Sequence, residues 1–260
     1  MGETNADADD QPVGETCLSF TVRGEWGHFR RVEGNIVKQT YRLMPRTTIA
    51  GLLAGVLGIG RDNYYDLFAE EVSAIAIEPR GTLRTMNIPQ NTLSTAKANI
   101  DMHPSRGHAR IGLPDPTDLR QQHNYEMLVE PEYRIDCWLD DEETYANLRR
   151  RLRNGESYYT PSLGLSECLA SITYHGEHNI ESADATDPVV DSAVVEAVDS
   201  VVLDQETPVR TEQSPGFMRT DDGGRVTTDF VAYGFSPRGD PLTVRDTDAC
   251  VVGGRKVMFS

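Results

Sequence analysis

The sequence predicts an α+β domain of the ferredoxin-like or RRM-like class, in which the order of elements is strand, helix, strand, strand, helix, strand. Two observations support this prediction. Short alternating apolar segments, typical of strands, flank two segments with helical spacing, and a long polar segment separates the second strand from the third. Hydrophobic residues make up 38% of the 260 residues, so the chain can bury a core.

The first half of the predicted fold spans residues 17–77. Residues 17–23 alternate between apolar and polar side chains and predict a strand. Helical spacing predicts a helix through Ile49, Leu52, Leu53, Val56 and Leu57. Thr47 or Thr48 is the candidate N-cap of this helix, and Gly58 ends it. Residues 72–77 predict the second strand.

The second half of the predicted fold follows the polar segment. Residues 133–139 alternate as a strand, and residues 140–153 predict a helix with acids in its first turn and arginines in its last turn. Residues 167–174 predict the fourth strand. Residues 226–235 and 254–260 predict further strands that complete the sheet or form a smaller lobe.

These elements divide the chain into segments of different composition. We expect a disordered acidic tail, an RRM-like domain with a long thumb-like insertion, an acidic insertion and a β-rich C-terminal extension. Their boundaries are 1–15, 16–175 with the insertion at 80–128, 176–205 and 206–260. The 80–128 insertion is too long for an ordinary loop and is expected to be functional or to form a hairpin of its own.

The charge distribution is uneven. The net charge is −16, yet residues 16–125 carry a small positive excess, whereas residues 154–209 carry acids and no base. Lysine occurs only at Lys38, Lys97 and Lys256, and all other bases are arginine. Excess carboxylate with little lysine suggests a halophile's protein. In such a protein, the net charge does not argue against nucleic-acid binding.

The cysteines and the hydropathy exclude several classes of protein. Cys17, Cys137, Cys168 and Cys250 are too widely spaced for a zinc ribbon, so we expect buried thiols in a reducing, cytoplasmic compartment. No apolar run is long enough to span a bilayer, and the acidic N-terminus is no signal peptide. We expect no membrane association, no metal and no cofactor.

Several motifs resemble one protein family. Gly24, Phe29-Arg30, Thr40-Tyr41 and residues 45–58 (PRTTIAGLLAGVLG) resemble the N-terminal signature of CRISPR-associated protein family five, and residues 159–170 resemble the segment before its next core strand. The resemblance covers roughly residues 16–175. It implies a RAMP-superfamily subunit that binds the 5′ handle of the guide RNA in a type I Cascade complex. The acidic composition fits a haloarchaeal subtype I-B member.

The resemblance also implies the residues that hold the RNA. Arginine forks suit phosphates, and aromatic rings suit unstacked bases. The candidates lie in the first loop, near the start of the first helix and in the insertion: Trp26, His28, Phe29, Arg30, Arg31, Tyr41, Arg46, Thr47, Thr48, Arg84, Lys97, Arg106, Arg110 and Arg120. The implied partners are the guide RNA, the backbone and large Cascade subunits and, indirectly, target DNA.

Two other functions stay open. The chain could be a metal-independent endoribonuclease that processes CRISPR repeat RNA, with candidates among Tyr41, Lys97, His103, His108 and His123. Catalytic relatives use a tyrosine with an adjacent Lys-His pair, and no such pair occurs in this sequence. We therefore expect no catalysis. The third possibility is a generic RNA-binding module outside CRISPR immunity.

Overall fold

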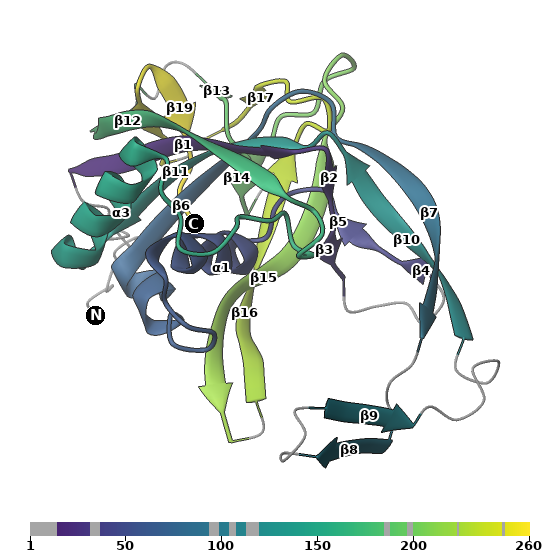
Figure 1. Cartoon of the computed structure of the whole chain (residues 1–260). Coiled ribbons are helices and arrows are strands. Elements are labelled where there is room, and N and C mark those ends of the chain that lie inside the picture. Colours follow the sequence, from purple (N-terminus) through teal and green to yellow (C-terminus); the bar gives the residue numbers. More distant parts are fainter. Residues whose placement is uncertain are drawn as a thin grey trace, which may run out of the picture.

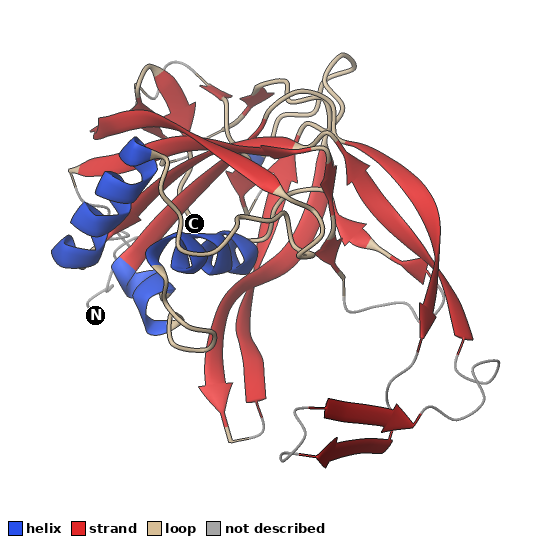
Figure 2. Ribbon diagram, in the orientation of Figure 1, coloured by secondary structure: helices blue, strands red, loops and turns tan. Residues whose placement is uncertain are grey.

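In the computed structural model, a central six-stranded sheet carries both helices on one face, and two long hairpins extend from this body (Figure 1). Strands make up most of the regular structure, as Figure 2 shows. The fold class is therefore mixed α+β, as predicted. The structure describes residues 15–31, 37–93, 99–103, 108–112, 120–184, 188–196, 200–222, 224–245 and 248–260.

The six-stranded sheet is antiparallel throughout. In spatial order its strands are β19 (Arg255–Val257), β18 (Cys250–Val252), β12 (Ala170–Ser182), β1 (Thr16–Gly24), β11 (Glu132–Leu139) and β6 (Ser73–Pro79). Along the chain, helix α1 (Arg46–Leu57) lies between β1 and β6, and helix α3 (Glu142–Asn154) lies between β11 and β12. β12 crosses the boundary at residue 175 that the sequence suggested, because its second half pairs with β1 and β18.

The ends of the helices only partly match the prediction. α1 begins after Pro45, whose carbonyl accepts from the amides of Thr48 and Ile49, and no side chain caps it. The prediction of a threonine cap is therefore wrong, because both threonines lie inside the first turn. Gly58 ends α1 in the left-handed conformation, at φ 82°, as predicted. In α3, the Asp141 carboxylate accepts from the Thr144 amide at 2.9 Å.

The main core lies between the sheet and the helices. Alternate residues of β1 and β11 point into it, including Phe20 and Tyr133, whose side chains are fully buried. Leu53 of α1 and Leu148 of α3 pack against them from below. The four cysteines are free thiols, and burial raises the pKa of Cys137 to about 12. Cys17, Cys137 and Cys168 are buried as predicted, whereas Cys250 is half-buried.

The 80–128 insertion forms antiparallel hairpins. β7 (Arg84–Leu93) pairs with β10 (Arg120–Val129) over their full lengths, and β8 (Asn99–His103) pairs with β9 (His108–Gly112) beyond them. We call the β7–β10 pair the thumb. It projects from one side of the body in Figure 1.

The C-terminal part adds a second long hairpin. β15 (Arg210–Asp221) pairs with β16 (Gly224–Phe235), and β14 (Val194–Val195) pairs with the base of β16. β13 (Val189–Val190) and β17 (Leu242–Thr243) form a small separate pair. The predicted strands 226–235 and 254–260 correspond to β16 and β19. The predicted acidic tail lies outside the described residues, apart from Glu15. Within the described ranges, no helix has the length and apolarity needed to cross a membrane.

Arg46 is fully buried and joins four parts of the chain. Its guanidinium donates to the carbonyl oxygens of Phe68 at 2.7 Å, Ser73 at 2.9 Å and Ser260 at 3.1 Å, and also to the Ser73 hydroxyl. The same group lies 4.2 Å from the centroid of the Phe217 ring on β15. Helix α1, the turn before β6, the C-terminus and the C-terminal hairpin therefore meet at one side chain.

We expect Arg46→Met to lower the free energy of unfolding by about 3 kcal/mol or more, because the buried carbonyl oxygens lose their donors. Arg153→Met removes the same charge from an exposed position on α3 and should change stability by about 0.5 kcal/mol at most. Urea unfolding followed by circular dichroism measures both. Equal stability of the two variants would contradict the structural role of Arg46.

Candidate nucleic-acid interface

The described part of the loop segment between β1 and α1 contains four short strands. β2 (Trp26–Gly27) pairs with the end of β10, and β3 (Phe29–Arg30) pairs with β5 (Thr40–Tyr41). β4 (Val37–Lys38) pairs in parallel with β10. The loop therefore lies against the base of the thumb, which brings together two of the predicted groups of residues.

The side chains of this loop differ in their accessibility. His28 and Phe29 are 1% exposed, Trp26 and Arg31 are half-buried, and Arg30 is exposed. In the β3–β5 pair, Phe29 lies opposite the buried Tyr41. The Phe29 ring therefore points inward, and the next residue, Arg30, is exposed. The accessible groups of the loop are therefore Arg30 and parts of Trp26 and Arg31.

A second segment, residues 161–170, supports the loop. The His28 amide donates to the Leu163 carbonyl at 3.0 Å. Gly164 has φ 89°, and a Cβ there would lie 2.0 Å from the His28 carbonyl oxygen, so only glycine fits. His28 Nδ1 lies 2.9 Å from the Glu126 carbonyl oxygen, and burial lowers the pKa of His28. His28 therefore anchors the loop as a neutral ring.

A buried polar cluster joins the base of the thumb to the body. The Arg42 guanidinium contacts Glu126 at 2.6 Å, and the other oxygen of Glu126 accepts from the Thr40 amide. Glu212 of β15 accepts from the amides of Arg42 and Leu43 at 2.7 and 3.1 Å. Burial alone would raise the pKa of Glu126, but the hydrogen bonds from Arg42 and Thr40 outweigh it and lower that pKa. Glu126 is therefore ionised at neutral pH, and its ion pair with Arg42 joins the thumb to the body.

Several predicted RNA-binding residues do not reach the surface. Tyr41 is buried, and the Arg31 guanidinium lies 5.2 Å from its ring centroid. Arg46 uses its donors inside the core. Thr47 is half-buried, and its hydroxyl donates to a carbonyl of β15 at 3.3 Å; Thr48 is also half-buried. Tyr41, Arg46, His28 and Phe29 are thus buried, which corrects the expectation that these four contact RNA. For the half-buried Thr47 and Thr48, contact with RNA stays a prediction.

The described arginines of the insertion lie on the thumb. Arg84 is exposed and forms a 2.9 Å ion pair with Glu130 at the surface. Arg120 is exposed at the far end of β10. Lys97 and Arg106 lie outside the described residues, and for Arg110 only the backbone, in β9, is described.

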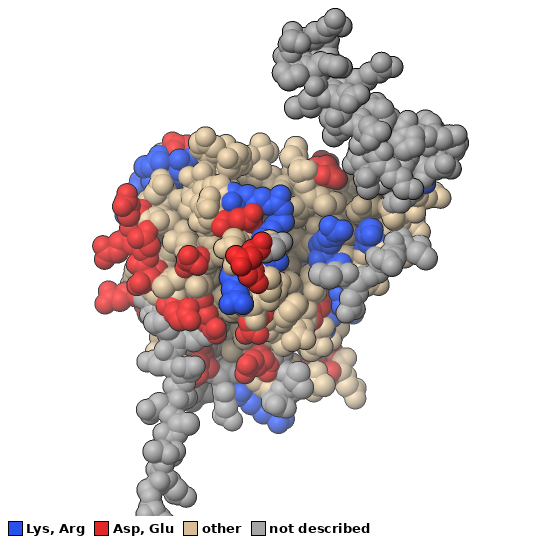
Figure 3. Space-filling model, turned by 90° about the horizontal axis from the view of Figure 1, so that it is seen from below, with Lys and Arg blue, Asp and Glu red and all other residues tan. Residues whose placement is uncertain are grey.

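The molecule is divided by charge. In Figure 3, Lys and Arg gather near the middle of the face and toward the side of β7 and β10, whereas Asp and Glu predominate on the side of α3. A cavity of about 560 Å³ on the α3 side is lined by Asp66, Leu67, Val72, Asp140, Asp141, Glu142 and Glu143. A polyanion is therefore favoured on the thumb side and repelled on the α3 side.

Some residues reach this interface without any local sequence signal. Lys38 does so because β4 pairs with β10, where its partner in register is Tyr125, 87 positions further along the chain. Arg42 and Glu212 come from segments that the sequence does not relate to each other. In the part of the chain that the structure describes, no three His, Cys, Asp or Glu side chains could hold a metal.

We expect Gly164→Ala to displace the 24–31 loop and to destabilise the fold by about 2 kcal/mol more than Gly155→Ala. Both glycines have positive φ, but a Cβ at Gly155 would meet nothing within 4 Å. Gly155→Ala therefore isolates the cost of the left-handed backbone, about 1–2 kcal/mol. Urea unfolding compares them, and equal losses would show that Gly164 does not constrain the loop.

Comparison with solved structures shows a shared fold. A structure described as a CRISPR RNA-guided surveillance complex matches with a TM-score of 0.52 and 11% sequence identity, covering 88% of this chain and 90% of that chain. A CRISPR protein from Archaeoglobus fulgidus matches with a TM-score of 0.47 and 14% identity, covering 93% and 97%. A search of curated proteins by sequence found no match.

The sequence also matches a family model over most of its length. The model, described as CRISPR-associated protein (Cas_Cas5), covers residues 17–229, which include β1, both helices, the thumb and most of the β15–β16 hairpin. This match confirms the resemblance seen in the sequence: the chain belongs to the CRISPR-associated Cas5 family.

Proposed function

We propose that this chain is a noncatalytic RNA-binding subunit of a type I CRISPR Cascade surveillance complex, where it caps the 5′ handle of the guide RNA. The observation that carries this proposal is the position of Arg30. Arg30 is exposed on β3, and the half-exposed Trp26 and Arg31 belong to the same segment, which lies at the base of the thumb. Membership of the Cas5 family supports the CRISPR context.

The chemistry of these groups suits an unpaired RNA strand. Arg30 offers a planar fork of N–H donors to a phosphate. Arg31 lies over the Tyr41 ring, which orients its guanidinium, and the exposed part of the Trp26 indole offers a surface for base stacking. The rigid support by Gly164 and His28 reduces the entropy lost when the loop binds a ligand.

The thumb is proposed to lie across the first guide positions and to touch the neighbouring backbone subunit. Its exposed arginines, Arg84 and Arg120, lie at opposite ends of the β7–β10 pair. A hairpin that carries cations at both ends can follow a polyanion along its length. The large subunit is proposed to bind elsewhere on the body, and target DNA is contacted indirectly through the guide.

The finer classification is also part of this proposal. We assign the β1–α1–β6–β11–α3–β12 core to the ferredoxin-like plan because its spatial order is β12-β1-β11-β6, with helices on one face. Subtype I-B and a haloarchaeal source are proposed from the arginine-rich, acidic composition, and a cytoplasmic location is proposed from the widely spaced cysteines.

A noncatalytic role is favoured over RNA cleavage by the surroundings of the candidate catalytic residues. Metal-independent cleavage needs a general base within hydrogen-bond reach of the 2′-hydroxyl. Tyr41 is only 7% exposed, and His123 lies on β10. His103 and His108 lie opposite each other in the β8–β9 pair, a separate hairpin. These positions do not support a single catalytic centre.

We expect Arg30→Gln/Arg31→Gln to weaken binding of an RNA that carries the handle by about tenfold or more, since each charge-assisted hydrogen bond to phosphate contributes about 1.5–3 kcal/mol. The matched control, Arg153→Gln, removes an exposed arginine from α3 and should leave the affinity unchanged. Fluorescence anisotropy with labelled handle RNA measures both. Equal affinities of the two variants would argue against this interface.

Co-purification tests the complex and distinguishes the alternative functions. The tagged chain is purified from its native host in high salt, and the accompanying RNA and proteins are sequenced. Mature guide RNAs with uniform 5′ handles, together with backbone subunits, are the expected result. Cleavage of a repeat hairpin by the chain alone would support the endoribonuclease instead, and heterogeneous RNA without CRISPR partners would support a generic RNA-binding module.

The affinity of the isolated chain should be modest at high salt. At about 1 M salt the Debye length is about 3 Å, and the favourable release of counterions from RNA is small. Binding then depends on stacking, hydrogen bonds and neighbouring subunits. We expect much tighter retention of the handle in the assembled complex than by the chain alone, measured by dissociation rates at molar KCl. Equally slow dissociation from both would contradict this.

A further inference from the structure

The face of the six-stranded sheet opposite the helices carries a row of polar side chains that the proposed handle site does not use. Strand register places Thr21 of β1 between Thr173 of β12 and Arg134 of β11. Because the neighbouring residues on β1 and β11 point into the core, these three side chains share the opposite face. The next row holds Arg23, at the end of β1.

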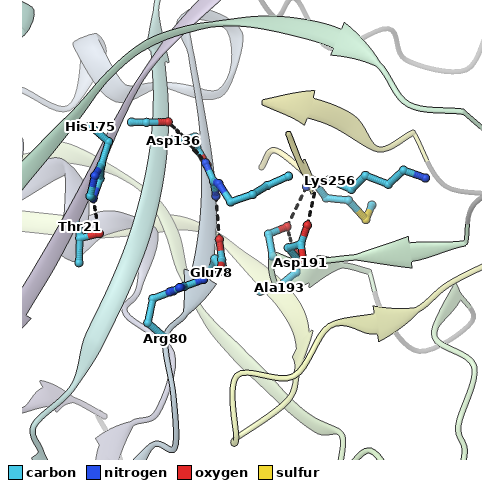
Figure 4. A network of polar contacts seen from close by, with 12 residues as sticks. Thr21, Glu78, Arg80, Asp136, His175, Asp191, Ala193 and Lys256 are labelled. Atoms are coloured by element: carbon cyan, nitrogen blue, oxygen red, sulfur yellow. Dashed lines mark hydrogen bonds and ion pairs between the residues drawn. The ribbon is translucent and has the colours of Figure 1, made fainter. Parts of the chain in front are cut away.

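Part of the charge on this face is neutralised internally. Arg255 of β19 contacts Glu78 and Asp136, each at 2.7 Å, and Arg80 forms a second ion pair with Glu78. Figure 4 shows Asp136, Glu78 and Arg80 of this network, with Thr21 and His175 to their left. The two arginines and the two acids balance, so this network adds no net charge to the face.

Arg134 forms no ion pair of its own within the described residues, and its acidic neighbours Asp136 and Glu78 are already paired with other arginines. It is half-buried beside this network, its Nε atom is buried without a hydrogen-bond partner, and no carboxylate lies within 4 Å among the described residues. Arg23 is exposed and also lacks an ion pair within the described part of the chain. The acid nearest to it in register is Glu132. Two unpaired guanidinium groups facing one carboxylate leave a positive excess here.

The neighbouring groups are suited to the same ligand. His175 Nε2 lies 2.7 Å from the Thr21 hydroxyl, and the hydroxyls of Thr173 and Ser171 belong to exposed residues. Burial lowers the pKa of His175, and the nearby Arg134 and Arg255 lower it further, against the opposite effect of Asp136. Guanidinium and hydroxyl donors together are the groups that proteins use to hold phosphate oxygens.

We infer that this sheet face binds the phosphate backbone of a single-stranded nucleic acid, with Arg134 and Arg23 as the cationic donors and Thr21 and Thr173 as hydroxyl partners. The ligand is a phosphodiester strand read by charge, without base recognition. RNA beyond the handle and unpaired DNA share this chemistry. The inference does not depend on the handle site, because none of its residues belongs to the 24–31 loop or to the thumb.

The test compares Arg23→Gln/Arg134→Gln with the matched control Arg153→Gln, in the full-length chain. Labelled single-stranded RNA without a handle, and DNA of the same sequence, are titrated by fluorescence anisotropy at several KCl concentrations. Two lost phosphate contacts should reduce the slope of log K against log salt by about 1.4, because each contact contributes about 0.7 on single strands. The control should keep the wild-type slope. A slope that falls with RNA alone, with DNA alone or with both shows which nucleic acid this face binds.

Equal slopes for the double variant and the control on both strands would overturn the inference. Replacing the half-buried Arg134 could disturb the fold, so Arg23→Gln is also tested alone. The slope of log K against log salt for this single variant should be smaller than the wild-type slope by about 0.7. Arg30→Gln/Arg31→Gln separates the two sites. If this variant keeps its preference for handle RNA while Arg23→Gln/Arg134→Gln loses slope, the handle proposal fails and the sheet-face site stands. The reverse pattern rejects the sheet-face site alone.

Discussion

The whole fold depends on one buried cation, Arg46. A guanidinium placed out of water needs all its donors satisfied, and this one finds carbonyl oxygens of Phe68, Ser73 and Ser260 and the face of the Phe217 ring. These acceptors lie on segments distant in sequence, so the contact forms only when α1, β6, the C-terminus and β15 are all in place. The interaction therefore links the folding of the N-terminal and C-terminal parts.

The surface that faces a ligand depends on a second buried cluster. Glu126 and Glu212 both interact with Arg42 or its backbone, which joins the thumb, β5 and β15. Gly164 and His28 hold the loop between β1 and α1 against this cluster. The proposed RNA interface therefore places few side chains outward, and buried groups hold the segment that carries Arg30 and Arg31.

For predicting where this protein could bind a polyanion, the positions of its charges matter more than its net charge. The acids that give the chain a net charge of −16 gather beside α3 and in the arginine-free segment from 154 to 209. The thumb side and the open sheet face keep arginines with few or no acidic partners. The net charge therefore does not exclude the two proposed nucleic-acid surfaces, because electrostatic effects fall off over a distance comparable to the Debye length.

The sequence by itself determined the mixed α+β class, the two long helices, the strands of the sheet core and the family, because periodicity and glycine positions are local properties. Tertiary structure alone decided which polar side chains are accessible. Arg46 and Tyr41 were reasonable RNA ligands by residue type, yet the core uses them. Arg134 and Lys38 gained importance only when strand register placed them beside distant segments. Burial and pairing are set by contacts between remote parts of the chain, and no local pattern encodes them.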